Sequence, residues 1–323
     1  MKLSNKTVMK LIKGAVYFEE DKGYLIPYRY SKAQLDYMAR DTYDHGWRWR
    51  ARISGGIRIE LMTDATELSF DYIASHTHER ANTVDLYVNN TLCSVYTIGE
   101  RMKGKISFNM REGYKRVCVY FPCESTLRIK SFTINSGYKS VKDKGLRILV
   151  LGDSITQGAG PSIGSASYLN SISRKLNCVT LGQGIGGYRY EPCDLMRIDG
   201  FDPDKIIVFL GTNYYEASCL ELGYDYAKAV KEYYAKLTEL YPDIPVLCIT
   251  PLWRNNGVDW QRFKWCIDTI KSACAEYENI KVVDGLDLVP NVDECFSDGV
   301  HPNAYGSELL ANNLISEMKR LKF

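Results

Sequence analysis

Serine, histidine and aspartate, the residue types of a hydrolytic triad, occur in this chain where their chemistry could be used. Ser154 follows the apolar run Ile148 to Leu151, and Gly152 at the end of that run allows a sharp turn. A serine there, just before a helix start, is expected to expose its hydroxyl and to aim its backbone N–H at an anion. The segment therefore predicts a nucleophilic serine at the carboxyl end of a buried strand.

A serine becomes a strong nucleophile only with a base, and the base needs an orienting group. Both groups occur in the loop Ser297-Asp-Gly-Val-His-Pro302, where His301 lies three positions after Asp298. We expect His301 to take the proton of Ser154 and Asp298 to fix the tautomer of the imidazole ring.

Two further turns follow apolar strands between these segments. One is the glycine-rich turn Leu181-Gly-Gln-Gly-Ile-Gly-Gly187, and the other is Phe209-Leu-Gly-Thr-Asn-Tyr214, which carries Asn213. Four strand-end turns thus supply a serine, a glycine N–H, a side-chain amide and an Asp/His pair. Open α/β sheets place their sites at such strand ends.

These four blocks, in this order, resemble the SGNH (GDSL-type) hydrolase superfamily over roughly residues 145 to 323. The resemblance implies a serine nucleophile, two oxyanion-hole residues and an Asp/His pair. By their positions in the blocks these are Ser154, then Gly187 and Asn213, then Asp298 and His301.

The chain departs from the family pattern at two positions beside these groups. Tyr214 stands where the family usually has an aspartate, and Gly182 stands where an asparagine often opens the glycine block. Neither change removes a catalytic group, but both reshape the pocket. Thr156 also excludes the Gly-x-Ser-x-Gly elbow of α/β-hydrolases.

The first part of the chain has the period-two pattern of β-strands. Residues 50 to 135 contain short segments that alternate apolar and polar residues, which predicts an antiparallel, jelly-roll-like β-sandwich. The strand with Asp85 is also similar to the sandwich domains that precede some SGNH hydrolases. One short helix is predicted for the segment Ser31 to Met38. The segments are Ile57–Leu61, Leu68–Tyr72, Val84–Val88, Ile106–Phe108, Val117–Phe121 and Leu127–Phe132.

The polar stretch Ser136 to Gly145 predicts a linker, and beyond it strands alternate with helices. This alternation predicts a three-layer α/β/α fold with a parallel, flavodoxin-like sheet. We therefore expect a sandwich domain over residues 1–143 and an SGNH-type domain over residues 144–323. The expected strands are 147–151, 178–181, 205–210, 246–249 and 280–283, and the expected helices are 168–176, 224–241, 260–277 and 304–321.

Composition limits the partners and the compartment. A formal charge of +2 gives no general attraction to nucleic acid or anionic membranes, and the sequence has neither a signal-peptide core nor an apolar run long enough to span a bilayer. Several of the ten cysteines lie in apolar strands, which predicts reduced thiols and a cytoplasmic protein. His76 and His78 have no cysteine nearby, so we expect no metal, and the mechanism needs no cofactor.

The resulting expectation is a serine esterase that hydrolyses short acyl esters, acetyl above all, on a small molecule or oligosaccharide. Carbohydrate is favoured by family resemblance and by an expected aromatic, polar rim for substrate binding. Two alternatives stay open: a lysophospholipase- or thioesterase-type acylhydrolase, and a carbohydrate-binding protein without catalysis. The sequence does not determine the oligomeric state. The expected rim consists of Tyr188, Tyr214, Tyr215, Trp253 and Arg254.

Overall fold

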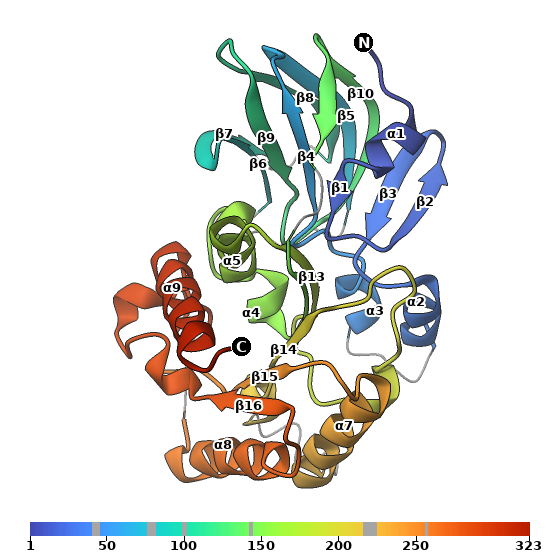
Figure 1. Ribbon diagram of the computed structural model, residues 1–323. Coiled ribbons are helices and arrows are strands. Elements are labelled where there is room, and N and C mark those ends of the chain that lie inside the picture. The colour runs from blue at the N-terminus through green and yellow to red at the C-terminus, as the bar shows by residue number, and fades with distance from the viewer. Residues whose placement is uncertain (41–45, 76–81, 99–101, 142–144, 216–224, 256–257) are drawn as a thin grey trace.

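The described part of the chain builds three β-sheets, an antiparallel pair toward the N-terminus and one parallel sheet toward the C-terminus (Figure 1). The predicted fold class, a sandwich followed by a three-layer α/β/α sheet, is confirmed. The structure, a computed structural model, describes residues 1–40, 46–75, 82–98, 102–141, 145–215, 225–255 and 258–323, without the side chains of Tyr214 and Tyr215.

The two antiparallel sheets pack face to face as a sandwich. Alternate residues of each strand point into the shared core, so Leu68, Phe70 and Tyr72 are buried while their neighbours are partly exposed. One sheet has the order β2 (Tyr17–Asp21), β3 (Tyr24–Tyr28), β10 (Thr126–Ile134), β5 (Glu67–Ser75) and β8 (Lys103–Asn109). The other has the order β1 (Ile12–Lys13), β4 (Arg58–Thr63), β9 (Lys115–Tyr120), β6 (Thr83–Val88) and β7 (Thr91–Thr97), with β11 (Tyr138–Ser140) paired to β4.

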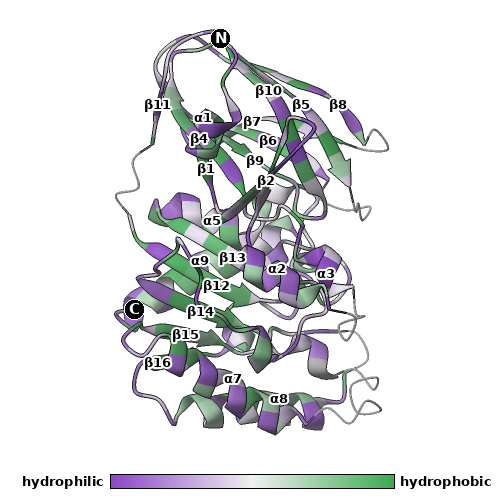
Figure 2. Ribbon diagram, turned by 90° about the vertical axis from the view of Figure 1, so that its right-hand side faces the viewer, coloured by the Kyte–Doolittle hydropathy of each residue, from purple (hydrophilic) through white to green (hydrophobic). Residues whose placement is uncertain are grey.

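The parallel sheet is buried on both faces, as its apolar strands predict (Figure 2). In β12 (Arg147–Gly152), next to the edge strand, Leu149 and Leu151 enter one core while Ile148 and Val150 enter the other. The strand order is β13 (Val179–Gly184), β12 (Arg147–Gly152), β14 (Lys205–Phe209), β15 (Val246–Ile249) and β16 (Ile280–Val283).

Helices cover both faces of this sheet. Each long helix begins at an Asp, Ser or Asn whose side chain accepts a hydrogen bond from a backbone N–H of the first turn. The core residues place α7 and α8 on one face and α5 and α9 on the other. The bounds are α4 (Ser154–Gln157), α5 (Tyr168–Leu176), α7 (Tyr226–Leu240), α8 (Trp260–Cys274) and α9 (Ala304–Arg320).

The described residues of the N-terminal part include the short helices α1 (Asn5–Met9), α2 (Lys32–Met38) and α3 (Trp47–Arg50). Ser31 caps α2, which confirms the predicted helix. Leu35, Met38 and Trp47 pack into the same core as one face of the parallel sheet. The predicted boundary at residues 143 and 144 lies outside the described residues, and core packing crosses between the two parts of the chain.

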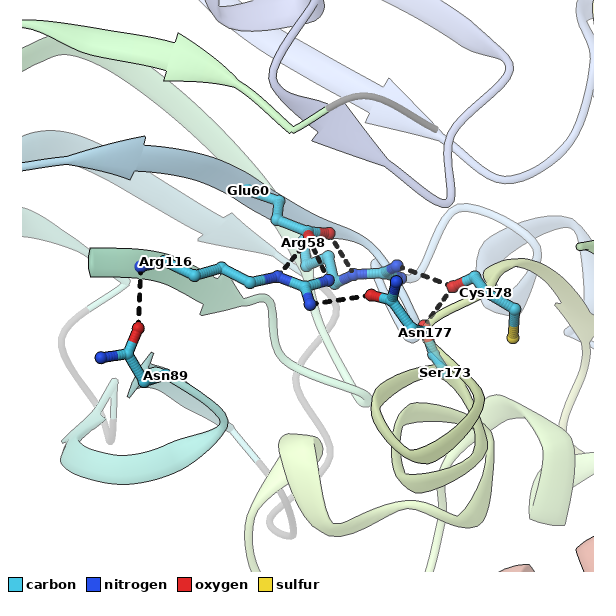
Figure 3. Close-up of polar contacts among 7 residues, drawn as sticks. All are labelled: Arg58, Glu60, Asn89, Arg116, Ser173, Asn177 and Cys178. Carbon is cyan, nitrogen blue, oxygen red and sulfur yellow. Dashed lines mark hydrogen bonds and ion pairs between the residues drawn. The ribbon is translucent and has the colours of Figure 1, made fainter. Parts of the chain in front are cut away.

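One contact between the two parts is a buried ionic cluster at the amino end of β13 (Figure 3). Glu60 accepts hydrogen bonds from Arg58 Nε at 3.3 Å and from Arg116 Nε at 2.7 Å. Arg58 Nη2 donates to the carbonyl of Cys178 at 3.3 Å, and Arg116 Nη1 donates to Asn177 Oδ1 at 2.8 Å. The cluster thus links β4 and β9 of the sandwich to the end of α5.

A second contact covers the free edge of β13, which is the edge strand of the parallel sheet. The N–H of Ile185 bonds to β12, so the carbonyls of Gly182 and Gly184 point away from that neighbour. Arg29, which is fully buried, donates Nη1 to both carbonyls, at 2.8 and 2.9 Å. The N-terminal part therefore satisfies an edge that would otherwise carry unpaired carbonyls.

Candidate active site

Ser154 lies at the carboxyl end of β12, where it is the first residue of α4. Asp153 caps this helix by accepting the N–H of Ile155 at 3.0 Å. A side chain at Gly152 would collide with Thr156, since its Cβ would lie 2.1 Å from the Thr156 hydroxyl. A glycine at the strand end is thus required for α4 to pack directly on the sheet.

The Ser154 residue is only 8% exposed, so the expectation of a freely exposed hydroxyl was wrong. The hydroxyl contacts the imidazole of His301 instead of open solvent alone. Ser154 Oγ lies 2.7 Å from His301 Nε2, within hydrogen-bond reach of a general base.

Asp298 and His301 form a compact loop that holds the imidazole in one orientation. Asp298 Oδ2 lies 2.8 Å from His301 Nδ1, and Asp298 Oδ1 accepts the backbone N–H of His301 at 2.9 Å and that of Val300 at 3.1 Å. Partial burial raises the pKa of Asp298, but these hydrogen bonds from His301 outweigh it, and the net pKa is lowered. The carboxylate is therefore available to orient and stabilise an imidazolium.

The glycine turn after β13 is held from both sides at Gly186. Its N–H donates to Gln157 Oε1 of α4 at 2.9 Å, and its carbonyl accepts Arg50 Nη1 of α3 at 2.7 Å. Gly187 follows with a φ of +75°, a conformation that favours glycine. The N–H of Gly187 is thus carried on a turn fixed by two side chains.

Asn213 lies in the short helix η3 (Thr212–Tyr215) after β14, and its side chain contacts the same turn. The amide Nδ2 donates to the carbonyl of Tyr188 at 3.0 Å. The buried Arg254 fixes η3 by donating Nη1 to the carbonyl of Thr212 at 2.7 Å. The structure therefore joins the asparagine turn to the glycine turn, as their strand-end positions suggested.

Residues 150–309 match the model of the GDSL-like lipase/acylhydrolase family, and this range contains all four blocks. The C-terminal part of the chain belongs to this family. A comparison with curated protein sequences gives no significant match.

Solved structures with this GDSL fold extend the likeness to almost the whole chain. Salicylyl-acyltransferase SsfX3 from a tetracycline biosynthetic pathway is 17% identical, with a TM-score of 0.78 over 96% of this chain and 94% of that one. A family two carbohydrate esterase from Clostridium thermocellum, in complex with cellohexaose, is 16% identical, with a TM-score of 0.68 over 96% and 98%. An acetyl xylan esterase from Butyrivibrio proteoclasticus is 17% identical, with a TM-score of 0.60 over 83% and 90%.

The residues predicted to form an aromatic rim of the GDSL domain lie in different surroundings. Tyr188 is buried, bonds to Asp194 through its hydroxyl at 2.7 Å and packs edge-on against Trp47, so its ring belongs to the core. Trp253 is partly buried, and its indole N–H donates a hydrogen bond to the carbonyl of Leu286 at 2.7 Å. Arg254 is buried under η3, not exposed at a rim. The side chains of Tyr214 and Tyr215 lie outside the described residues.

Sequence reasoning missed the residues that position the turns. Gln157 lies three residues after Ser154 and carried a signal, since an amide inside the serine block can reach the neighbouring turn. Arg29 and Arg50 carried none, because they lie far from the glycine turn in sequence. Asp153 is also notable, because burial raises its pKa to about 7 against the opposing effects of the Ile155 N–H and Arg254.

The described residues also bear on metal binding, thiol chemistry and membrane insertion. In the described ranges no cluster of His, Cys, Asp or Glu could hold a metal ion, and His76 and His78 lie outside those ranges. The nine cysteines of the described ranges are all free thiols. None of the helices described is long and apolar enough to cross a membrane.

Proposed function

We propose that this GDSL acylhydrolase is a serine esterase that removes short acyl groups, acetyl above all, from carbohydrate through an acyl-enzyme. The observation that carries the proposal is the chain of contacts from Ser154 Oγ to His301 Nε2 at 2.7 Å and from His301 Nδ1 to Asp298 Oδ2 at 2.8 Å. These distances suit a nucleophile, its base and the group that orients the base.

In the first step, His301 Nε2 accepts the proton of Ser154 as Oγ attacks the ester carbonyl carbon. The carbonyl π electrons move onto the oxygen, which becomes an oxyanion. We assign its stabilisation to the N–H of Ser154, the N–H of Gly187 and the amide of Asn213, as the family resemblance implies. Donors aimed at a developing oxyanion give the largest single contribution in many such enzymes.

The tetrahedral intermediate then collapses, and the alcohol leaves with the proton that His301 holds. Water enters and gives a proton to His301 as it attacks the acyl group on Ser154. Collapse of this second intermediate releases the carboxylic acid and returns the proton from His301 to Ser154. Asp298 keeps its negative charge throughout and stabilises the imidazolium in both steps.

The proposed acetylated carbohydrate substrate is supported by the neighbours and not by the site alone. Two structural neighbours carry the names acetyl xylan esterase and carbohydrate esterase, the second in complex with cellohexaose. We propose that Tyr214 and Trp253 contact the substrate, whereas Tyr188 contributes its backbone carbonyl to Asn213.

The test is hydrolysis of p-nitrophenyl acetate, p-nitrophenyl octanoate and acetylated xylo-oligosaccharides by the wild type and Ser154→Ala. We expect acetyl esters to be preferred, and Ser154→Ala to lose activity by about three orders of magnitude or more. Ser162→Ala, at an exposed serine in the loop after α4, is the matched control and should keep full activity. Activity of Ser154→Ala within tenfold of wild type would refute the nucleophile, and a preference for octanoate would favour a lipase-like enzyme.

A second candidate function is transfer of the acyl group to an alcohol other than water. SsfX3, with a TM-score of 0.78, is a salicylyl-acyltransferase, and the same acyl-enzyme serves hydrolysis and transfer. Adding a sugar or phenolic acceptor to the assay separates the two. A hydrolase releases free acid at an unchanged rate, whereas a transferase forms the new ester in preference.

A further inference from the structure

We infer that Arg50, from the N-terminal part of the chain, positions the oxyanion donor of the α/β domain by fixing the peptide plane that carries the Gly187 N–H. The inference rests on the proposed function, since it takes Gly187 as an oxyanion donor. Arg50 touches no reacting atom in this account. It acts through the peptide bond between Gly186 and Gly187.

The argument begins with the peptide unit itself. The Gly186 carbonyl and the Gly187 N–H belong to one planar trans peptide and point in opposite directions. Arg50 Nη1 donates to that carbonyl at 2.7 Å. Because the carbonyl is held toward α3, the N–H is held away from α3. A single hydrogen bond thereby sets the direction of the donor.

Glycine at this position makes such support necessary. Gly187 has a φ of +75° and glycine is conformationally permissive, so the turn alone leaves the peptide plane free to rotate. The Gly186 N–H is fixed by Gln157 Oε1, but that bond constrains the preceding peptide plane. Arg50 supplies the constraint on the plane that matters for the oxyanion.

The guanidinium is itself close to the turn and charged. A Cβ built on Gly187 would lie 3.2 Å from Arg50 Nη1 and 3.8 Å from the indole nitrogen of Trp47. A cationic donor on a carbonyl polarises the whole amide, which makes its N–H a better donor. Arg50 therefore orients the Gly187 N–H and strengthens it.

The position of α3 is in turn fixed by a second arginine. Arg29 donates Nη2 to the carbonyl of Arg50 at 3.1 Å and Nη1 to the carbonyls of Gly182 and Gly184. Together the two arginines satisfy the carbonyls of residues 182, 184 and 186 in succession. Figures 1 and 2 show α2 and α3 at this junction of the sandwich and the parallel sheet.

The test uses the full chain with Arg50→Met, which keeps an apolar stem but no donor, and Arg50→Lys, which keeps one. We expect Arg50→Met to lower kcat on p-nitrophenyl acetate about 10- to 100-fold, a fraction of the loss of a whole oxyanion donor. KM should change by less than about threefold, because the bond to the oxyanion forms in the transition state. Arg50→Lys should lie between Arg50→Met and wild type.

A boronic acid inhibitor adds to the serine as a transition-state analogue. Its affinity should not change if Arg50 has only a structural role. We expect the affinity to fall by the same factor as kcat/KM, while the thermal midpoint of each variant confirms folding. Arg48→Ala is the matched control, because Arg48 is in the same helix but its guanidinium lies over the Trp49 ring, 5.0 Å from the centroid. This control should keep the wild-type kcat.

The outcomes separate this inference from the proposed function. Wild-type kcat and boronate affinity in Arg50→Met, with Ser154→Ala inactive, would overturn the role of Arg50 and leave the esterase intact. Arg50→Lys no better than Arg50→Met would attribute the loss to packing and would also overturn it. If Ser154→Ala stays active, the proposed function fails instead.

Discussion

The N-terminal part of the protein contacts both ends of the edge strand β13, and the two ends are held differently. At the amino end, Arg58 and Arg116 share the buried carboxylate of Glu60 and reach the end of α5 (Figure 3). At the carboxyl end, Arg29 and Arg50 donate to backbone carbonyls, and within the described ranges neither pairs with a carboxylate.

The difference between these ends shows which contacts of the N-terminal part lie next to the proposed site. β13 has six residues, so its ends lie about 17 Å apart. Only the carboxyl end leads into the Gly186–Gly187 turn. We therefore expect substitutions at the amino end to change stability alone. Substitutions at the carboxyl end should change both stability and kcat.

The largest expected effect on stability comes from the amino end. Glu60→Gln removes a carboxylate that is 2% exposed and leaves the buried Arg58 without its charged partner. Breaking a buried pair in this way typically costs about 3–5 kcal/mol of unfolding free energy. Urea denaturation measures this loss, and kcat of the folded variant should match wild type.

Asp21→Asn is the control for this prediction, because it breaks a surface pair between Asp21 and Arg128 in the same sandwich. Exposed pairs contribute about 0–1 kcal/mol, so little change is expected. A Glu60→Gln protein that is fully stable, or that is folded but slow, would erase the proposed contrast between the two ends.

Arg29→Lys tests the carboxyl end and should have the next largest effect on stability. A lysine cannot serve all the carbonyls that Arg29 reaches, and each buried carbonyl left without a donor costs about 1–3 kcal/mol. We expect a loss of about 3 kcal/mol and, unlike Glu60→Gln, a kcat lowered about tenfold through α3 and the glycine turn. An unchanged kcat in the folded variant would uncouple β13 from the site.

The pH dependence of the free energy of unfolding is a third property, after stability and kcat, that should distinguish the two ends of β13. Burial raises the pKa of Asp153 to about 7, and that residue lies beside the carboxyl end of β13. Its unfolded pKa is near 4, so between about pH 4 and 7 the folded state holds a proton that the unfolded state has lost. Rising pH therefore lowers the unfolding free energy by about 1.4 kcal/mol per pH unit in this window.

Asp153→Asn should remove the contribution of Asp153 to the slope of unfolding free energy against pH. Glu60→Gln should leave that contribution unchanged. Part of the slope should persist in Asp153→Asn, because burial, and secondarily Asp194, raise the pKa of Glu191 to about 7 as well. Urea unfolding curves at pH 5, 6 and 7 measure the slope. An Asp153→Asn slope equal to wild type would mean that Asp153 is ionised in the folded protein.

The sequence predicted those features that depend on neighbouring residues. Helix α5 and strands β15 and β16 have the expected bounds, because hydrophobic periodicity and an N-cap serine are local signals. The loop with Asp298 and His301 was recognisable for the same reason. The hydrogen bonds that Asp298 accepts within this loop join residues at most three positions apart.

Features that depend on distant contacts were not predicted. Strands β2 and β3 were missed, since residues 1 to 45 gave no clear pattern. Tyr188 and Arg254 were placed on a rim by residue type, but the core and η3 bury them. Arg50 lies 136 positions before Gly186, and nothing in its own segment indicates an arginine that binds the glycine turn.

The most direct test of the central claim is to locate the nucleophile by covalent labelling. The protein is treated with a fluorophosphonate, digested and mapped by mass spectrometry, with His301→Ala in parallel. We predict one adduct per chain, on the peptide that contains Ser154, and much slower labelling in His301→Ala because Ser154 then lacks its base. An adduct on a different residue, or full esterase activity in a protein that carries the adduct on Ser154, would contradict the claim.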